Sequence, residues 1–384
     1  MTRFQKLFFI ISAVFSLCVC RTSATIIPIG EPDEFPSIDF PEGFSLVDIA
    51  PDGHSMQLQS SVVPVDVVVR LYEDGDHASA LEALSHSLAR LKARGDTDTF
   101  TWRNESCAIS SFVNALGAYS GYGCAVELPD EKGIIVILVW TEKKNYSRYG
   151  SFMLSVIDGL HIDYGSYYEA GPVSLYAYPD AGSAVPVSLT IDGVAVASEM
   201  RETDKEASAY LIEREYDVLL LYRNSALWKE AWQRYYRMIF RDSSHRLKRL
   251  AFDVYTALAP NCVDETDLAQ KLLSWTQGFV YEREKTTSDF ASLPSIILGG
   301  GSDCDSRCLL LAVLLRQMNM DAIVFVSKTY SHAVAGLVSD HPGHSFSVGN
   351  TDYLIGETTA KGAGWGMISQ EQDRPENWIP VLFP

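Results

Sequence analysis

Cys304 is the first of three residues in the last third of the chain whose types and spacing suit nucleophilic catalysis. It follows the glycine-rich residues 299–303 and precedes residues 305–318, which are apolar all round and therefore predict a buried helix. Backbone N–H groups and the dipole at a helix start stabilise a thiolate and lower the pKa of a thiol. Asp303 and Asp305 act in the opposite direction. We therefore expect a positive group beside Cys304.

A histidine and an acid follow in the order of a thiol triad. His332 begins one predicted strand and Glu357 ends another, at separations of 28 residues from Cys304 and 25 residues from His332. In such a triad the imidazole removes the thiol proton and the carboxylate selects the imidazole tautomer. The pattern predicts Cys304 as the nucleophile, His332 as the base and Glu357 as the orienting acid.

Each of these residues has a rival or a simpler interpretation. His341 and His344 are alternative bases, but they lie in a Pro-Gly turn rather than at a strand start. Asp352 is an alternative acid, and Glu357 could be a solvated strand end. Cys304 could be an inert buried thiol, as most free cysteines are.

The remaining cysteines beyond residue 24 admit two interpretations each. Cys107 and Cys124 predict either a disulfide or two buried free thiols. Cys308, one helical turn after Cys304, is a core residue or a resolving thiol. A zinc site built from Cys304, Cys308 and His332 lacks a fourth ligand at the usual spacing. We expect neither a metal nor a cofactor.

The elements that must position these residues predict an α+β chain of more than one domain, because 384 residues exceed one ordinary core. We expect an α+β domain of unassigned role at 25–205, a helical connecting segment at 206–260 and the catalytic domain at 261–384. In the first domain, residues 25–60 are expected to wrap the surface. The other elements expected there are strands at 61–72, 133–140, 149–157 and 173–178, a hairpin at 185–196, and a helix between Asp76 and Gly95.

The catalytic region resembles a known family. Residues 299–316 resemble the cysteine motif of the transglutaminase-like superfamily, and residues 277–281 resemble the segment that precedes it. Residues 332–334 and 353–359 resemble its histidine and acid motifs, and 364–366 fit bacterial members. The resemblance implies a papain-like α+β core, in which a buried helix carrying the cysteine packs on an antiparallel sheet. It also implies acyl transfer through a thioester without a metal.

Four positions depart from that pattern. Ser302 stands where the family usually has glycine, and Cys308 where it has a small residue. Glu357 replaces the commoner aspartate. Asp305 stands where animal transglutaminases have an aromatic residue. The last departure favours hydrolysis of a peptide or amide over protein cross-linking.

The N-terminus predicts export. An apolar run at 7–20 after a basic start, followed by small residues at 22–24, predicts a signal peptide over 1–24. The alternatives are an uncleaved membrane anchor and a lipid anchor at Cys18 or Cys20, neither of which follows a small residue. No second long apolar run follows, so we expect a soluble mature protein without a membrane span, in the periplasm or cell envelope or outside the cell.

Charge and motifs together predict the class of partner. The formal net charge of −18 repels phosphate backbones, so we expect no nucleic-acid partner. The expected activity is that of an exported cysteine peptidase or amidase acting on a peptide, a protein or a cell-wall-like amide. The alternatives are an inactive domain of the same fold that serves as a binding or scaffold module in the cell envelope, and an amine-accepting acyltransferase.

Overall fold

The computed structural model describes residues 26–29, 35–282, 288 and 290–384, and it is a mixed α+β structure, as expected. The chain divides into two compact units. Unit 1 comprises residues up to 167, 171–176 and 217–234. Unit 2 comprises 168–170, 177–216 and 235–384. The predicted signal peptide, with Cys18 and Cys20, lies outside the described residues.

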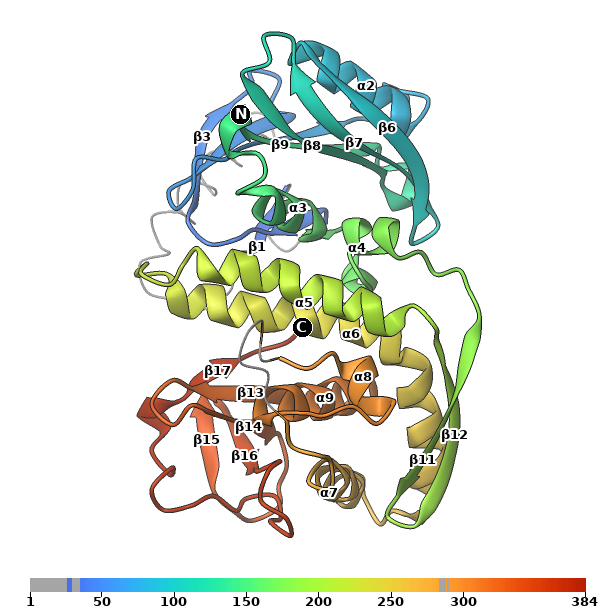
Figure 1. Ribbon diagram of the computed structural model, residues 1–384, viewed down its shortest axis with the longest axis vertical. Coiled ribbons are helices and arrows are strands. Elements are labelled where there is room, and N and C mark those ends of the chain that lie inside the picture. The colour runs from blue at the N-terminus through green and yellow to red at the C-terminus, as the bar shows by residue number, and fades with distance from the viewer. Residues whose placement is uncertain (1–25, 30–34, 283–287, 289) are drawn as a thin grey trace. The chain divides into compact units, whose positions relative to one another are not determined.

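Unit 1 is built on a seven-stranded antiparallel sheet in the order β3-β4-β5-β9-β8-β7-β6 (Figure 1). Its strands are β3 (Phe44–Ile49), β4 (Ser55–Ser60), β5 (Asp66–Tyr72), β6 (Ala93–Trp102), β7 (Glu105–Asn114), β8 (Tyr119–Glu127) and β9 (Ile134–Glu142). A small sheet joins β1 (Ile26–Pro28), β2 (Ser37–Asp39) and β10 (Leu160–His161). The helices are α2 (Ala80–Arg90), α3 (Gly150–Asp158) and α4 (Pro172–Ala177).

The central strand β9 is apolar on both faces because a helix covers each face of the sheet. Ile134, Val136 and Leu138 pack in one core cluster with Leu84 of α2. The alternate residues of the strand pack on the other face with Phe152 of α3. Side chains of a strand alternate between faces, so a continuous apolar run is what a doubly covered strand requires. Figure 1 shows α2 and α3 on opposite sides of the sheet.

Two long helices contribute residues to both units. They are α5 (Asp204–Leu220) and α6 (Trp228–Leu258), which confirm the helical pattern expected at 206–260. Short 3-10 turns occur at Pro129–Glu131, Lys143–Asn145, Tyr164–Tyr168, Ala259–Asn261 and Pro375–Asn377.

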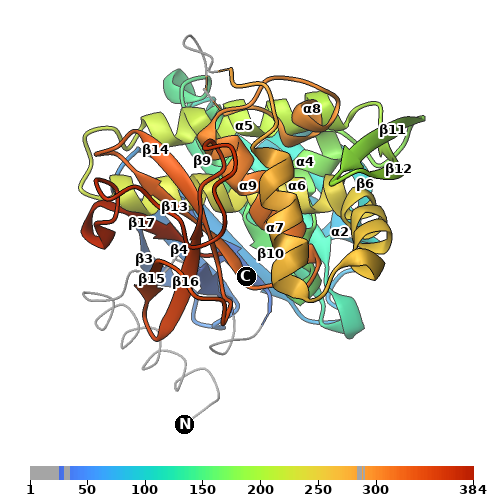
Figure 2. The same ribbon diagram turned by 90° about the horizontal axis from the view of Figure 1, so that it is seen from below.

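Unit 2 contains a five-stranded antiparallel sheet in the order β15-β16-β14-β13-β17. The largely buried helix α9 (Cys304–Gln317) packs on β13 and β14, and α7 packs on α9 (Figure 2). The strands are β13 (Ala322–Ser327), β14 (His332–Leu337), β15 (Ser345–Val348), β16 (Thr351–Gly356) and β17 (Ile379–Val381). The other elements are α7 (Glu265–Thr276), α8 (Leu293–Ile297) and the hairpin β11 (Ala184–Ile191) and β12 (Val194–Arg201).

Two of the expected strands are helices. Residues 149–157 form most of α3, and residues 173–178 form most of α4. In α3, Phe152, Met153, Val156 and Ile157 are buried, which is one face of a helix. A short apolar run suits a buried helix as well as a strand, so periodicity did not separate the two.

The expected helix between Asp76 and Gly95 is shorter than predicted. Ser79, rather than Asp76, caps α2 by accepting a hydrogen bond from the Glu82 N–H. The helix ends before Lys92, which has a positive φ of 53°. Gly95 lies inside β6. The segment 25–60, expected to wrap the surface, instead supplies four strands and the buried side chain of Phe40.

Cys107 and Cys124 are free buried thiols, which resolves the two interpretations given above. In the register of β7 and β8, Cys107 is opposite Val126 and Cys124 is opposite Ile109. The two cysteines are therefore diagonal neighbours. Diagonal positions on adjacent antiparallel strands are roughly 7–8 Å apart, which is too far for a disulfide.

A buried arginine holds together three parts of unit 1. The Arg234 guanidinium donates to the Asp39 carbonyl at 2.9 and 3.1 Å, to the Ser155 hydroxyl at 2.8 Å and to the Ser155 carbonyl at 3.1 Å. The Asp39 carboxylate lies 3.6 Å from Nε, and both side chains are almost fully buried. The interaction joins α6 to β2 and α3.

Replacing Arg234 with methionine should destabilise unit 1 by about 3–5 kcal/mol, because it leaves a buried carboxylate and two carbonyls without this donor. Urea denaturation followed by circular dichroism measures the change. Arg90→Met, at an exposed position in the last turn of α2, is the matched control and should change stability by less than about 0.5 kcal/mol. Equal stability of the two variants would show that the Arg234 interaction is energetically unimportant.

Candidate active site

Cys304 is the first residue of α9, and the residue before it caps the helix. The Asp303 carboxylate accepts hydrogen bonds from the Ser306 N–H, at 2.9 Å, and from the Ser306 hydroxyl. The Asp303 N–H donates in return to Ser306 Oγ at 3.0 Å. This reciprocal pattern is a capping box, so the local sequence determines that the helix begins at Cys304.

Glycine is required in the loop that leads to Cys304. Gly299 has a φ of +91°, which L side chains rarely adopt. A Cβ on Gly300 would lie 2.8 Å from the Ser295 carbonyl oxygen. Ser302, where a glycine was expected from the family pattern, is fully buried and donates its hydroxyl to the Val280 carbonyl at 3.0 Å. The serine therefore has a structural role in the loop.

His332 and Glu357 are brought together by the register of two neighbouring strands. His332 is the first residue of β14, and Glu357 directly follows β16. Ala335 is opposite Gly356, so the end of β16 lies beside the start of β14. His332 Nε2 lies 2.7 Å from Glu357 Oε2, at hydrogen-bond distance.

The Glu357 carboxylate is oriented by a second set of hydrogen bonds. Its Oε1 accepts from the Thr359 N–H at 2.7 Å and from the Thr359 hydroxyl at 2.6 Å. Burial alone would raise the pKa of Glu357, but His332 and Thr359 lower it below its usual value. An ionised carboxylate at Oε2 requires a proton on Nε2 of His332, which leaves Nδ1 as the nitrogen that can accept a proton.

The Cys304 thiol lies beside the same strand but does not bond to the imidazole. The Ala333 N–H, directly after His332, lies close enough to the sulfur to lower the pKa of the Cys304 thiol. The thiol itself donates to Asp305 Oδ2 at 3.4 Å. Within the described residues no hydrogen bond joins Cys304 to His332. The structure thus brings His332 and Glu357 together and places Cys304 beside β14, with its thiol hydrogen-bonded to Asp305.

The Cys304 pKa differs from the sequence-based expectation. Burial raises the pKa of Cys304 strongly, and the charges of Asp305 and Asp303 raise it further, while the Ala333 N–H lowers it. Only 1% of the residue is exposed. A helix start lowers a thiol pKa only where solvent or cations offset burial, and here burial and two carboxylates dominate.

Arg307, one helical turn after Cys304, was not identified from the sequence. Its guanidinium donates to the Ser302 hydroxyl at 2.8 Å, to the Phe279 carbonyl at 2.7 Å and to the Thr358 carbonyl at 3.3 Å. It therefore ties the cysteine loop to the end of α7 and to the segment that carries Glu357. It is also a positive charge close to the thiol, of the kind that the flanking aspartates led us to expect.

Gln277 connects the same segments and was likewise missed as a site residue. Its amide nitrogen donates to the carbonyls of Glu357 and Ala363, both at 2.9 Å, and its oxygen accepts from the Gly362 N–H at 3.0 Å. Both amide hydrogens are used, so Gln277 positions the loop after Glu357. The only signal in the sequence was its place in the segment that precedes the cysteine motif.

The rival residues lie elsewhere. His344 pairs with Asp373 at 3.0 Å, and Asp352 accepts a hydrogen bond from the Ser347 hydroxyl. Cys308 is fully buried and lies 3.3 Å from the Thr358 hydroxyl. Over the described part of the chain, no group of three or more His, Cys, Asp or Glu side chains is arranged to hold a metal. Nor does any described helix have the length and apolar character that a membrane crossing requires.

Comparisons with known proteins add no assignment. No family model matches the chain, and no curated protein matches it. Among solved structures, cyanobacterial PsbP (CyanoP) from Synechocystis sp. PCC 6803 is similar at 11% identity and a TM-score of 0.31, over 38% of this chain and 96% of that one. A crystal structure from Bacteroides thetaiotaomicron VPI-5482 is similar at 10% identity and a TM-score of 0.22, over 55% and 75%. Likenesses this weak carry no argument about fold or function.

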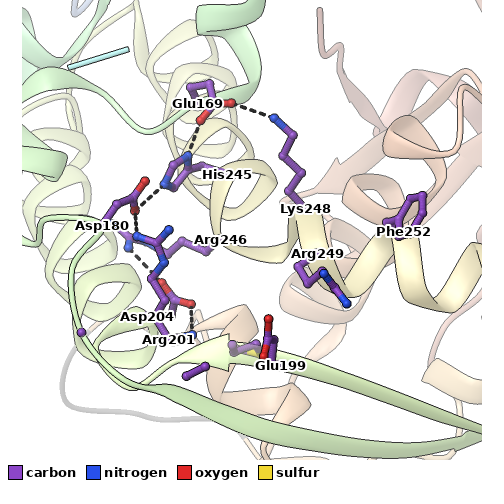
Figure 3. Close-up of a pocket in the computed structure, with 13 residues that line it drawn as sticks. Glu169, Asp180, Glu199, Arg201, Asp204, His245, Arg246, Lys248, Arg249 and Phe252 are labelled. Atoms are coloured by element: carbon purple, nitrogen blue, oxygen red, sulfur yellow. Dashed lines mark hydrogen bonds and ion pairs between the residues drawn. The ribbon is translucent and has the colours of Figure 1, made fainter. Parts of the chain in front are cut away.

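A separate cavity of about 730 Å³ in unit 2 is lined mainly by charged residues that pair with one another (Figure 3). His245 lies between Glu169, which also binds Lys248 at 3.0 Å, and Asp180, at 2.9 Å. Arg246 forms two hydrogen bonds of 2.8 Å with Asp242 in the same helix. Because these charges are paired internally, the cluster stabilises the fold of unit 2.

His245 should make the stability of unit 2 depend on pH on the alkaline side. Burial alone would lower the pKa of His245, but Asp180 and Glu169 raise it to about 9, above its ordinary value of 6.5. A pKa raised in the folded state contributes stability that is complete below pH 6.5 and is lost as the pH rises through about 9.

Urea denaturation between pH 6 and pH 10 measures this dependence, with His245→Gln as the variant that cannot titrate. The difference in unfolding free energy between the wild type and His245→Gln should be constant below pH 6.5 and shrink towards pH 9. A difference that stays constant across the whole range would contradict the assigned charge state of His245.

Proposed function

We propose that this protein is an exported, transglutaminase-like cysteine hydrolase that cleaves a peptide or cell-wall-like amide through a thioester. Cys304 is the nucleophile, His332 the base and Glu357 the acid that orients the base. One observation carries the proposal, namely the His332–Glu357 hydrogen bond of 2.7 Å. His332 begins β14, and the N–H of the next residue, Ala333, lies close enough to the Cys304 sulfur to lower the pKa of the thiol. A buried helix on an antiparallel sheet, with the cysteine first in the helix, supports a papain-like core.

The proposed reaction has two stages, formation of the thioester and its hydrolysis. The proton of Cys304 Sγ moves to His332 Nδ1, and the sulfur electron pair forms a bond to the substrate carbonyl carbon. In this proposal the Cys304 N–H, which is at the start of α9, binds the developing oxyanion. His332 then gives its proton to the leaving amine as the C–N bond breaks. Water, deprotonated by His332, attacks the thioester and releases the acid and the free thiol.

The Glu357 carboxyl and the Cys304 thiol have opposite pKa shifts, and each shift has a consequence for the proposed roles. The pKa of Glu357 is lowered, so it stays ionised and holds the imidazole. The pKa of Cys304 is raised, so the thiol needs a base at the moment of attack.

A binding or scaffold module with the same fold is the second candidate, and one observation favours it. Cys304 is 1% exposed, so a substrate cannot reach the sulfur without local movement. An amine-accepting acyltransferase is a third candidate, which Asp305 disfavours because it replaces an aromatic residue beside the nucleophile. Export to the periplasm, the cell envelope or the outside of the cell is part of the proposal, and rests on residues 1–24.

Alkylation of Cys304 by iodoacetamide at pH 7 should be at least about tenfold slower in His332→Ala than in the wild type, because the imidazolium stabilises the thiolate by roughly one pKa unit or more. Peptide mass spectrometry of the mature protein measures the Cys304 adduct separately from the other cysteines. His341→Ala, in an exposed turn, is the control and should label like the wild type. Identical rates in both variants would favour the binding module.

Glu357→Gln should lower the rate of acetylation of Cys304 by p-nitrophenyl acetate roughly 10²-fold or more, because the amide no longer selects the Nε2–H tautomer. Stopped-flow release of p-nitrophenol and the acetyl adduct mass measure this rate. Glu376→Gln, at an exposed site, should leave it unchanged. Added glycinamide distinguishes the activities, since free acetate indicates hydrolysis and acetylglycinamide indicates acyl transfer.

A further inference from the structure

Two carboxylates flank Cys304, and they make different contacts. Asp303 precedes the cysteine, and its Oδ1 is engaged by the N–H and the hydroxyl of Ser306 in the capping box. Asp305 follows the cysteine, and its Oδ2 lies 3.4 Å from the thiol sulfur, within the distance of an S–H···O hydrogen bond. Asp305 is therefore the carboxylate that competes with His332 for the thiol proton.

The position of Asp305 is determined by a tyrosine from another helix of unit 2. Tyr236 of α6 donates its hydroxyl to Asp305 Oδ1, so the two oxygens of one carboxylate join the tyrosine and the cysteine. The Tyr236 ring is 1% exposed and packs edge-on against Phe290 at a centroid distance of 5.7 Å. A buried phenol needs a hydrogen-bond acceptor, and Asp305 supplies it.

Tyr236 remains a donor over the ordinary range of pH. Burial raises the pKa of Tyr236 well above its usual value, and the charge of Asp305 raises it further. The phenol thus cannot exchange its role with the carboxylate. Rotation of Asp305 away from the sulfur would leave the buried Tyr236 hydroxyl without this acceptor, which is unfavourable for a buried donor.

We infer that Asp305, held by the Tyr236 hydroxyl, is a positioning residue that keeps Cys304 a neutral thiol with its proton turned away from His332 in the resting site. This inference rests on the proposed function only for its consequence in catalysis. The contact between Asp305 and the thiol exists whether or not the protein is an enzyme.

The balance of charge around the sulfur supports this role. The Ala333 N–H lowers the pKa of Cys304, whereas burial and the two flanking carboxylates raise it. The groups that interact with Cys304 are Asp303, Asp305, Arg307 and Cys308 of α9 and its cap, and Tyr236 of α6. His332 begins β14 directly before Ala333, and its imidazole bonds to Glu357. Asp305 is the charged group among them that accepts the thiol proton.

The arrangement defines how a reaction would start. The S–H bond turns from Asp305 Oδ2 to His332 Nδ1, the proton passes to Nδ1, and the sulfur pair becomes available to a carbonyl carbon. Until then the thiol is neutral. A neutral thiol reacts slowly with oxidants, since the thiolate is the form that is oxidised. Asp305 thereby protects a nucleophile that is expected to work outside the cytoplasm.

The test compares the pH dependence of Cys304 alkylation by iodoacetamide in the full mature chain. Asp305→Asn keeps the volume and an acceptor for Tyr236 but removes the charge. It should move the half-maximal pH of the rate profile down by about 1 unit, which is about tenfold faster labelling at pH 7. Tyr236→Phe should give an intermediate shift. Asp340→Asn, at an exposed site, is the matched control and should leave the profile in place.

Each outcome is informative once thermal melting shows that the variants are folded. A profile of Asp305→Asn that coincides with that of Asp340→Asn, or that moves to higher pH, overturns the inference. A profile of Tyr236→Phe identical to the wild type overturns the part assigned to Tyr236. His332→Ala in the Asp305→Asn background separates the two proposals. If the shift caused by Asp305→Asn is the same with and without His332→Ala, this inference stands and the triad is refuted. If His332→Ala changes the labelling profile and Asp305→Asn does not, the triad stands and this inference is refuted.

Discussion

The burial of α9 is the constraint on which the rest of the candidate site depends. A helix that is apolar on every face is stable only inside the protein, so the position of its first residue is determined by the core. The position of Cys304 is therefore well defined, because the capping box of Asp303 and Ser306 determines where the helix starts. The same burial removes solvent from the sulfur and raises the pKa of the thiol. The burial that defines the position of Cys304 therefore also makes its thiol harder to ionise.

The polar residues around α9 reduce that conflict without exposing the helix. Arg307 brings a positive charge into the core, and its hydrogen bonds all go to neutral oxygens of three separate segments. Gln277 does the equivalent for the loop after Glu357 with an uncharged amide. A buried arginine that bonds only to carbonyl and hydroxyl oxygens retains more of its field than one neutralised by a carboxylate. It can therefore act on the sulfur as well as on the loops.

The sequence predicted the elements of unit 2 that carry chemistry more accurately than the framework of unit 1. The helix at 305–318 and the strands that begin at His332 and end before Glu357 are marked by dense apolar or β-branched runs. The strands β6 to β8 were not expected, because residues 93–127 are rich in glycine and serine. They are strands because they pair with one another and with β9, which is a tertiary effect. The role of Arg307 in joining three segments could not be identified, since two of its three partners are carbonyl groups far away in the sequence, at Phe279 and Thr358.

The misassigned helix α3 and the unexpected pKa of Cys304 have the same origin. In each case a local rule was applied to a segment whose surroundings decide the outcome. An apolar run at 149–157 becomes a helix because it must cover one face of a sheet. The Cys304 thiol at the helix start stays neutral because it is buried and because Asp305, which a purely local view treats as one more charge, is held against the sulfur by Tyr236, 69 residues earlier in the chain. Because of this long-range contact, Asp305 opposes ionisation of Cys304 through a directed hydrogen bond as well as through its charge. The contact also determines whether Asp305 or His332 holds the thiol proton.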